Sequence, residues 1–250
     1  MHRQGLRAVV FGRHNPVPEE FLKSYMGIYH SNFGEKTGPT IQEMQKDLLS
    51  EHGSIRPYIA LAVIGKGANA QVVGGAFFVY SSKSRSFHTG MFCIDTALQR
   101  KRVGSFLFKK AEEQLAKLEP KARFITAESV AIRPISAQAI EPREKTIQRA
   151  KFWERHGLKR IGISGINKDA RAEWDVRVKE IGKKKQAKEI SLGQTARLLV
   201  DFHRNPLIHD YSIPRAKSFK ISPDGKEIVR QIIGKPKTSM LRKKPKLPHM

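Results

Sequence analysis

Residues 92–107 read FCIDTALQRKRVGSFL, and this stretch decides the fold of the chain around it. It begins as an apolar strand, turns through a basic segment, and continues as an amphipathic helix. The first N–H groups of such a helix have no partner within the helix, and the positive end of the helix dipole lies behind them. The turn is therefore predicted to bind an anion such as a diphosphate.

The side chains of the turn supply further donors. Four consecutive residues can donate to an anion: Gln99, Arg100, Lys101 and Arg102. Gly104 has no Cβ, so the backbone can approach a diphosphate closely.

Turn residues divide the rest of the chain into short predicted elements. Before this stretch we expect a strand at residues 6–11, a helix at 19–30, a helix between Thr40 and Gly53, and strands at 58–64 and 72–81. After it we expect a helix at 103–118, a strand at 123–130, a helix at 145–156 closed by Gly157, and strands at 158–163 and 174–181. Thr40 and Glu43 have the spacing of a capping box. The order of the predicted strands and helices favours a mixed α/β sheet over a doubly wound one.

The stretch resembles the GNAT superfamily of acyl-CoA N-acyltransferases, in which Q/R-x-x-G-x-G/A follows a hydrophobic strand and opens a helix. Gln99, Arg102 and Gly104 fall on that spacing, with Arg102 in place of the first glycine. Residues 150–160, AKFWERHGLKR, are similar to the family's late F-Y-E-K-x-G-F element. The resemblance implies a three-layer sandwich over residues 1–182, with a central, mostly antiparallel twisted sheet flanked by helices.

The resemblance also implies how acetyl-CoA binds. Its pantetheine arm would lie between two splayed strands, along Phe92, Cys93 and Ile94. Its diphosphate would contact the N–H groups of Val103, Gly104 and Ser105, with Arg102 in a backbone conformation open to residues with a Cβ. A main-chain N–H near Cys93 or Ile94 would polarise the thioester. Cys93 itself is interpreted as a buried apolar residue; a nucleophilic role is the minor reading.

An amine nucleophile must lose a proton before it attacks, so a carboxylate near the thioester is needed. Glu128 is the candidate base; the alternative is that it only forms an ion pair with a cation. Asp95 is the reserve candidate, although its position also suits a turn cap. His88 lies in the strand that enters the site and is interpreted as structural.

The resemblance places Trp153, beside the cofactor, where the family often has the tyrosine that protonates the departing thiolate. Indole cannot serve as that acid. Three outcomes are open: Tyr80, Tyr58 or water replaces it, the thiolate leaves unprotonated, or catalysis is degraded.

Composition limits the partners. The chain has 47 Lys plus Arg against 23 Asp plus Glu, a net charge of +24, so we expect an anionic partner such as nucleic acid. One cysteine forms no disulfide framework, and no Cys/His cluster indicates a metal. No apolar run approaches the roughly 20 residues that span a bilayer, so a cytoplasmic protein without a membrane partner is expected.

The C-terminal part differs in composition. Residues 183–235 are predicted to form a helical or irregular extension, and residues 236–250 a basic tail that is disordered in the free protein. The predicted function is acetyl transfer from acetyl-CoA to a primary amine, on an acceptor that is anionic or associated with nucleic acid. Two alternatives stay open: a non-catalytic nucleic-acid-binding protein on this scaffold, and a small-metabolite acetyltransferase with an incidental basic tail.

Overall fold

The computed structural model describes residues 5–34, 38–50, 53–130, 143–167, 172–182 and 218–221. Their strands are β1 (Arg7–Phe11), β2 (Ile55–Ile64), β3 (Gln71–Ser81), β4 (Ser86–Ile94), β5 (Phe124–Val130), β6 (Lys159–Asn167), β7 (Ala172–Glu180) and β8 (Ser218–Ile221). Their helices are α1 (Glu19–Phe33), α2 (Ile41–Leu49), α3 (Val103–Leu118) and α4 (Arg143–Arg155), with short 3₁₀ turns η1 (Gly67–Asn69) and η2 (Thr96–Leu98).

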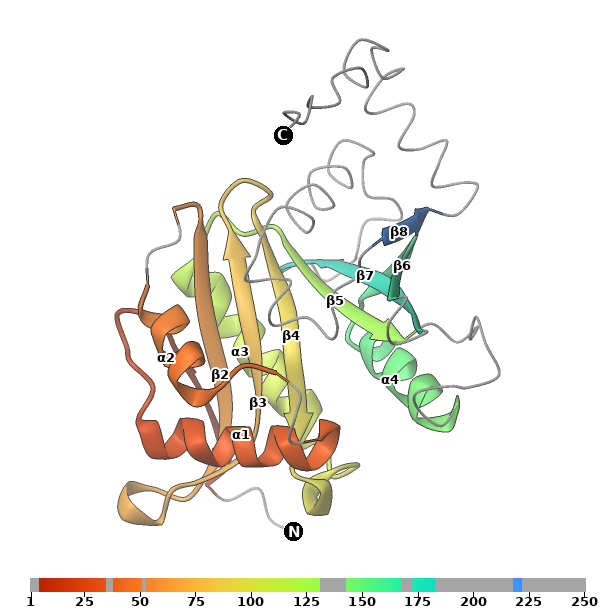
Figure 1. The fold of residues 1–250 in the computed structure, drawn as a ribbon. Helices are drawn as coiled ribbons and strands as arrows, with labels where there is room; N and C mark the ends of the chain where they lie inside the picture. Colours follow the sequence, from red (N-terminus) through yellow and green to blue (C-terminus); the bar gives the residue numbers. More distant parts are fainter. Residues whose placement is uncertain are drawn as a thin grey trace, which may run out of the picture.

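The strands form one sheet in the order β1-β2-β3-β4-β5-β7-β6-β8 (Figure 1). All neighbouring strands are antiparallel except β4 and β5, which are parallel. The chain therefore needs a crossover between those two strands, and α3 provides it across the back of the sheet in Figure 1. The mixed, mostly antiparallel sheet predicted from the sequence is confirmed.

Helices cover both faces of the sheet. On one face, α1 and α2 bury Leu22, Tyr25 and Met44 against the side chains of β2 and β3. On the other face, the apolar stripe of α3 packs under the same strands together with Trp153 of α4. The result is the predicted three-layer sandwich, with one hydrophobic core on each side of the sheet (Figure 1).

Local sequence signals hold the ends of the helices. Thr40 and Glu43 form the predicted capping box at the start of α2, with both reciprocal hydrogen bonds present. Gly157 follows α4 with a φ of 82°, as expected for the glycine that closes a helix. Gly75 of β3 lets α1 pack closely, because a Cβ there would lie 2.6 Å from the ring of Tyr25.

A β-bulge bends β4 at its middle. Phe77 of β3 pairs with Gly90 and Gly75 pairs with Cys93, so β4 has one residue more than β3 over this interval. Met91 has a φ of 48° within the extra length. Beyond the bulge β4 diverges from β5: their pairing runs from Ser86 and Phe124 to Thr89 and Ala127, and then stops.

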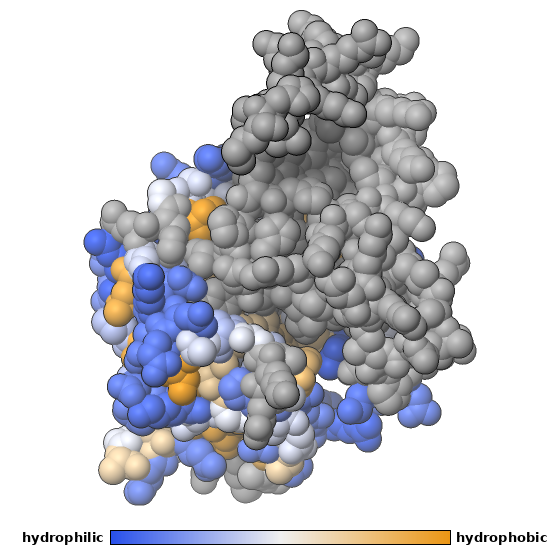
Figure 2. Space-filling model, viewed as in Figure 1, coloured by the Kyte–Doolittle hydropathy of each residue, from blue (hydrophilic) through white to orange (hydrophobic). Residues whose placement is uncertain are grey.

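β8 was not predicted from the sequence; it pairs with β6 at the edge of the sheet, inside the range expected to be a helical or irregular extension. Apart from β8, the C-terminal extension and the basic tail lie outside the described residues, beyond Gly182. No helix of the described part has the length and hydropathy to span a bilayer. Hydrophilic side chains cover much of the described surface in the view of Figure 2. Among the described residues, the large hydrophobic side chains exposed to solvent are Leu49 and Leu118.

Candidate active site

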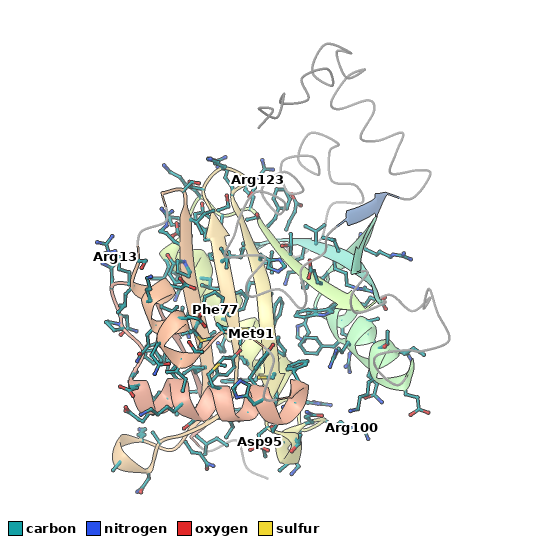
Figure 3. The ribbon with its side chains drawn as sticks, viewed as in Figure 1. Arg13, Phe77, Met91, Asp95, Arg100 and Arg123 are labelled. Carbon is teal, nitrogen blue, oxygen red and sulfur yellow. The ribbon has the colours of Figure 1, made fainter. Side chains whose placement is uncertain are left out.

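The divergence of β4 and β5 opens a groove of about 740 Å³. It is lined by the second half of β4, the turn that opens α3, β5 at Glu128, and α4, while α1 contributes its last turn. Figure 3 labels Met91, which lines the groove, partway along β4, and Asp95 and Arg100 in the turn beyond the lower end of that strand.

Ten of the residues singled out from the sequence line this groove: Phe92, Cys93, Ile94, Gln99, Arg100, Arg102, Gly104, Ser105, Glu128 and Trp153. Two others do not. Lys101 is exposed to solvent outside the groove lining, and Val103 is buried in the core beneath the turn.

The turn between β4 and α3 has a strained backbone. Asp95 caps η2, because its Oδ1 accepts from the N–H of Ala97 at 2.8 Å; this is the turn-cap reading of Asp95. Arg100 and Arg102 have φ values of 61° and 65°, in the left-handed region that favours glycine. We expected Arg102 to adopt a conformation open to side chains; instead it keeps a backbone suited to the glycine it replaces, which costs about 1–2 kcal/mol.

The start of α3 points unpaired donors at the groove side of the turn. The first intrahelical bond of α3 runs from the N–H of Phe106 to the carbonyl of Arg102 at 3.0 Å. The N–H groups of the three residues between them therefore have no acceptor inside the helix. A Cβ on Gly104 would meet Ile94 and Phe92 at 3.5 Å, an ordinary contact, so packing alone does not require glycine there.

Main-chain groups of β4 also face the groove. The N–H of Asp95 donates to the carbonyl of Val73 on β3 at 3.0 Å. Successive residues of a strand direct their N–H groups to opposite sides, so the N–H of Ile94 is directed away from β3, toward the groove. The carbonyl of Ile94 accepts from the side chains of Asn32 and Gln99, each at 3.3 Å. The side-chain amide of Gln99 is therefore hydrogen-bonded to other groups of the protein.

Aromatic side chains form the wall of the groove on the α4 side. The ring of Phe92 lies 5.2 Å from that of Phe152 and 5.5 Å from that of Trp153. Trp153 is almost fully buried in this cluster. It supplies apolar surface and, as an indole, no transferable proton.

His156 joins this wall to the turn. Its Nε2 lies 3.0 Å from Oγ of Ser105, in the first turn of α3, and its ring packs on Phe108 and Phe152. Burial, with help from the charges of Lys179 and Arg155, lowers the pKa of His156 to about 4. The imidazole is therefore neutral near pH 7. Sequence reasoning missed this contact, since 51 residues separate the two side chains.

Glu128 lies where β4 and β5 separate, directly after Ala127, the last residue of β5 that pairs with β4. Its carboxyl group touches the groove but is closely surrounded by protein, and this burial raises the pKa of Glu128 to about 8. Among the described residues, no Lys or Arg forms an ion pair with it. The alternative that Glu128 only forms an ion pair therefore has no cationic partner among the described residues.

Cys93 and His88 are both buried, although both line the groove. Burial raises the pKa of the Cys93 thiol to about 12, so it stays protonated. His88 is buried, and its Nδ1 lies 3.2 Å from Oγ1 of Thr126.

Neither tyrosine considered as the acid lies in the groove. Tyr58 donates to Oε1 of Glu119 at 2.6 Å, and Tyr80 pairs with Phe87 at the far end of β4. Tyr58 and Tyr80, two of the open alternatives to the family's tyrosine, are therefore absent from the groove lining, and the alternative of water stays open. A third tyrosine, Tyr25, is buried under the bulge and donates to the carbonyl of Met91, on the α1 side of the sheet.

The groove is rimmed by positive charge. Its cationic side chains are Arg100, Arg102, Lys145, Arg149, Lys151 and Arg155. Its acidic side chains are Glu128 and Glu154, and Glu154 accepts from the buried Arg177 at 3.2 Å. Among the described residues, no group of three or more His, Cys, Asp or Glu side chains could hold a metal ion.

No family model matches the chain, and no curated protein matches it. Solved structures do. The chain is similar to an aminoglycoside 6'-N-acetyltransferase complexed with coenzyme A, at 13% identity and a TM-score of 0.50, over 72% of this chain and 99% of that one. It is equally similar to a putative acetyltransferase of the GNAT family from Desulfovibrio desulfuricans, at 14% identity and a TM-score of 0.50, over 71% of this chain and 100% of that one.

The likeness to these two acetyltransferase structures shows the class of fold. The chain has the GNAT fold, and the fold predicted from residues 92–107 is confirmed.

Proposed function

We propose that the protein is a GNAT-type N-acetyltransferase that transfers an acetyl group from acetyl-CoA directly to a primary amine. One observation carries the proposal. A single groove brings together a helix N-terminus with open donors, a strand edge with an inward N–H, and a buried carboxyl group with a raised pKa.

The turn and β4 account for binding of the thioester. The N–H groups of Val103, Gly104 and Ser105 hold the diphosphate, and the guanidinium groups of Arg100 and Arg102 add charge. Phe92 and Trp153 cover the pantetheine arm. The N–H of Ile94 donates to the thioester oxygen, where negative charge develops during attack.

Glu128 acts as the general base. It accepts a proton from the acceptor ammonium, and the freed amine forms a C–N bond to the acetyl carbon. The C–S bond then breaks with the electron pair leaving on sulfur, and the attacking nitrogen releases its second proton to water, which leaves a neutral amide. A pKa of about 8 suits this step, because the base must take a proton from an amine and be regenerated near neutral pH. With indole at Trp153, the thiolate leaves as the anion or takes a proton from water.

The charges favour an anionic acceptor. Cations outnumber acids along the groove, and the whole chain has a net charge of +24. Such a surface attracts an amine carried on an acidic molecule and repels a polyamine. We therefore propose an acceptor amine on an acidic peptide or on a nucleic-acid-associated molecule.

The experiment compares two lysine peptides of equal length, one acidic and one basic, in an assay that detects the thiol of released CoA. We expect a higher kcat/KM for the acidic peptide at low salt, and convergence of the two values as salt rises. Equal rates at low salt would contradict the anionic-acceptor proposal. No CoA release with any amine, together with salt-sensitive RNA binding, would instead favour the non-catalytic alternative.

Deleting the residues after Gly234 distinguishes a small-metabolite acetyltransferase from an enzyme whose acceptor is associated with nucleic acid. A small-metabolite enzyme keeps its kcat/KM without the basic tail. A nucleic-acid-directed enzyme loses affinity for its acceptor in a salt-dependent way.

A further inference from the structure

The last turn of α1 reaches the floor of the groove. Asn32 donates through Nδ2 to the carbonyl of Ile28 in its own helix at 2.8 Å and to the carbonyl of Ile94 at 3.3 Å. Its Oδ1 accepts from Nε2 of Gln99 at 2.9 Å, and the same Nε2 donates to the carbonyl of Ile94 at 3.3 Å. One side chain of α1 thus joins the end of β4 to the start of the turn.

The next residue of α1 contacts the opposite side of the groove. The guanidinium carbon of Arg149, on α4, lies 5.4 Å from the ring centre of Phe33. Phe33 in turn packs on the buried ring of Tyr29, with the ring centres 4.9 Å apart. The last turn of α1 is therefore anchored in the core and contacts both the turn and α4.

The turn needs such an anchor because its backbone is strained. Arg100 and Arg102 are both in the left-handed region, at φ 61° and 65°. This backbone conformation is unfavourable for residues with a Cβ, and it persists only when the surroundings fix it. On one side α3 fixes the turn through the bond from Phe106 to Arg102. On the other side the hydrogen bonds of Gln99 fix it.

We propose that Asn32 is a positioning residue: it holds Gln99 and thereby keeps the strained turn, before any ligand arrives, in the shape that receives the diphosphate. This inference rests on the proposed function, because the ligand of the turn is taken to be acetyl-CoA. It makes the last turn of α1 a physical link between the cofactor site and the contact of Phe33 with Arg149.

A double-mutant cycle tests the proposal. Acetyl-CoA binding is measured by calorimetry for wild type, Asn32→Ala, Gln99→Ala and the double variant, with Ser31→Ala as the matched control on the same helix turn. Ser31 is exposed and bonds only within α1, to the carbonyl of Ile28. We expect each single variant to weaken Kd about threefold to tenfold, because both variants remove the hydrogen bond between Asn32 and Gln99 that holds the turn. The double variant should be no weaker than Gln99→Ala, and Ser31→Ala should match wild type.

Two further readouts separate positioning from general stability. The KM for acetyl-CoA should rise in Asn32→Ala while kcat stays near wild type, because bound cofactor itself holds the turn at saturation. Asn32→Asp, which keeps the acceptor for Gln99, should recover part of the affinity. Additive losses in the cycle, or a lowered Tm with unchanged Kd, would overturn the role of Asn32. Wild-type protein that binds no acetyl-CoA would overturn the proposed function instead.

Discussion

Replacing Glu128 by Gln should make the protein more stable at alkaline pH and almost inactive. The folded protein raises the pKa of Glu128 from 4.5 to about 8, so folding favours the protonated carboxyl group. Stability from this group is fully present below about pH 4.5 and is lost as pH rises to about 8. The full difference corresponds to at most about 5 kcal/mol, and solvent screening at an open groove reduces it to about 2 kcal/mol.

Gln has the shape of the protonated side chain and does not titrate, so the variant avoids this loss. We expect Glu128→Gln and wild type to have equal free energies of unfolding at pH 4, below the ordinary pKa of a Glu, and the variant to be more stable by about 2 kcal/mol at pH 9. Urea unfolding at both pH values measures the difference, with Glu113→Gln as the control, since Glu113 is exposed and pairs with Lys110. A variant less stable than wild type at pH 9 would refute a buried, unpaired carboxylate.

The same residue sets the pH dependence of the reaction. Because a general base must be deprotonated, wild-type kcat/KM should rise with pH and level off above about pH 8. Glu128→Gln should lose about 10²- to 10⁴-fold in kcat, whereas Glu113→Gln should keep the wild-type profile. A pH-independent wild-type rate between pH 6 and 9 would remove Glu128 from the mechanism.

Three other variants follow from the structure. Arg102→Gly should raise stability by about 0.5–1 kcal/mol, because relief of a φ of 65° exceeds the added entropy of the unfolded chain; a lower Tm would contradict the left-handed conformation. In wild type, the folded state lowers the pKa of His156 to about 4, so stability is lost as pH falls from about 6.5 to 4 because unfolding takes up a proton. His156→Gln should abolish this loss. An unchanged acid unfolding curve would contradict the burial of the imidazole. Gly75→Ala should destabilise by about 1–3 kcal/mol, because its Cβ would lie 2.6 Å from the ring of Tyr25; wild-type urea unfolding would contradict the tight packing of α1 on β3.

Much of the fold could be predicted because its signals are local. The capping box of Thr40 and Glu43, the glycine that closes α4, and the apolar stripe of α3 each act over a few residues. β8 was missed because its four residues are stabilised by pairing with β6 and not by their own pattern.

The site could be predicted where one segment supplies it and where the family resemblance reaches, as at Glu128 and Trp153. The turn after β4 is continuous in sequence, so its groove-lining residues were found from pattern alone. The contacts of Asn32 with Gln99 and of His156 with Ser105 join residues 67 and 51 positions apart, and no local signal reports them. Tyr58 and Tyr80 were misplaced because strand register, which sets their distance from the groove, depends on pairing across the sheet.

Calorimetry of acetyl-CoA binding to wild type and to Gly104→Ala tests most directly whether the start of α3 holds the cofactor. An alanine Cβ fits the protein at 3.5 Å and improves helix propensity, so the variant should be as stable as wild type or more stable. It should nevertheless bind acetyl-CoA at least about tenfold more weakly, because a Cβ obstructs close approach of the backbone to the ligand. Unchanged affinity in Gly104→Ala, or no binding by wild type, would contradict the proposed cofactor site.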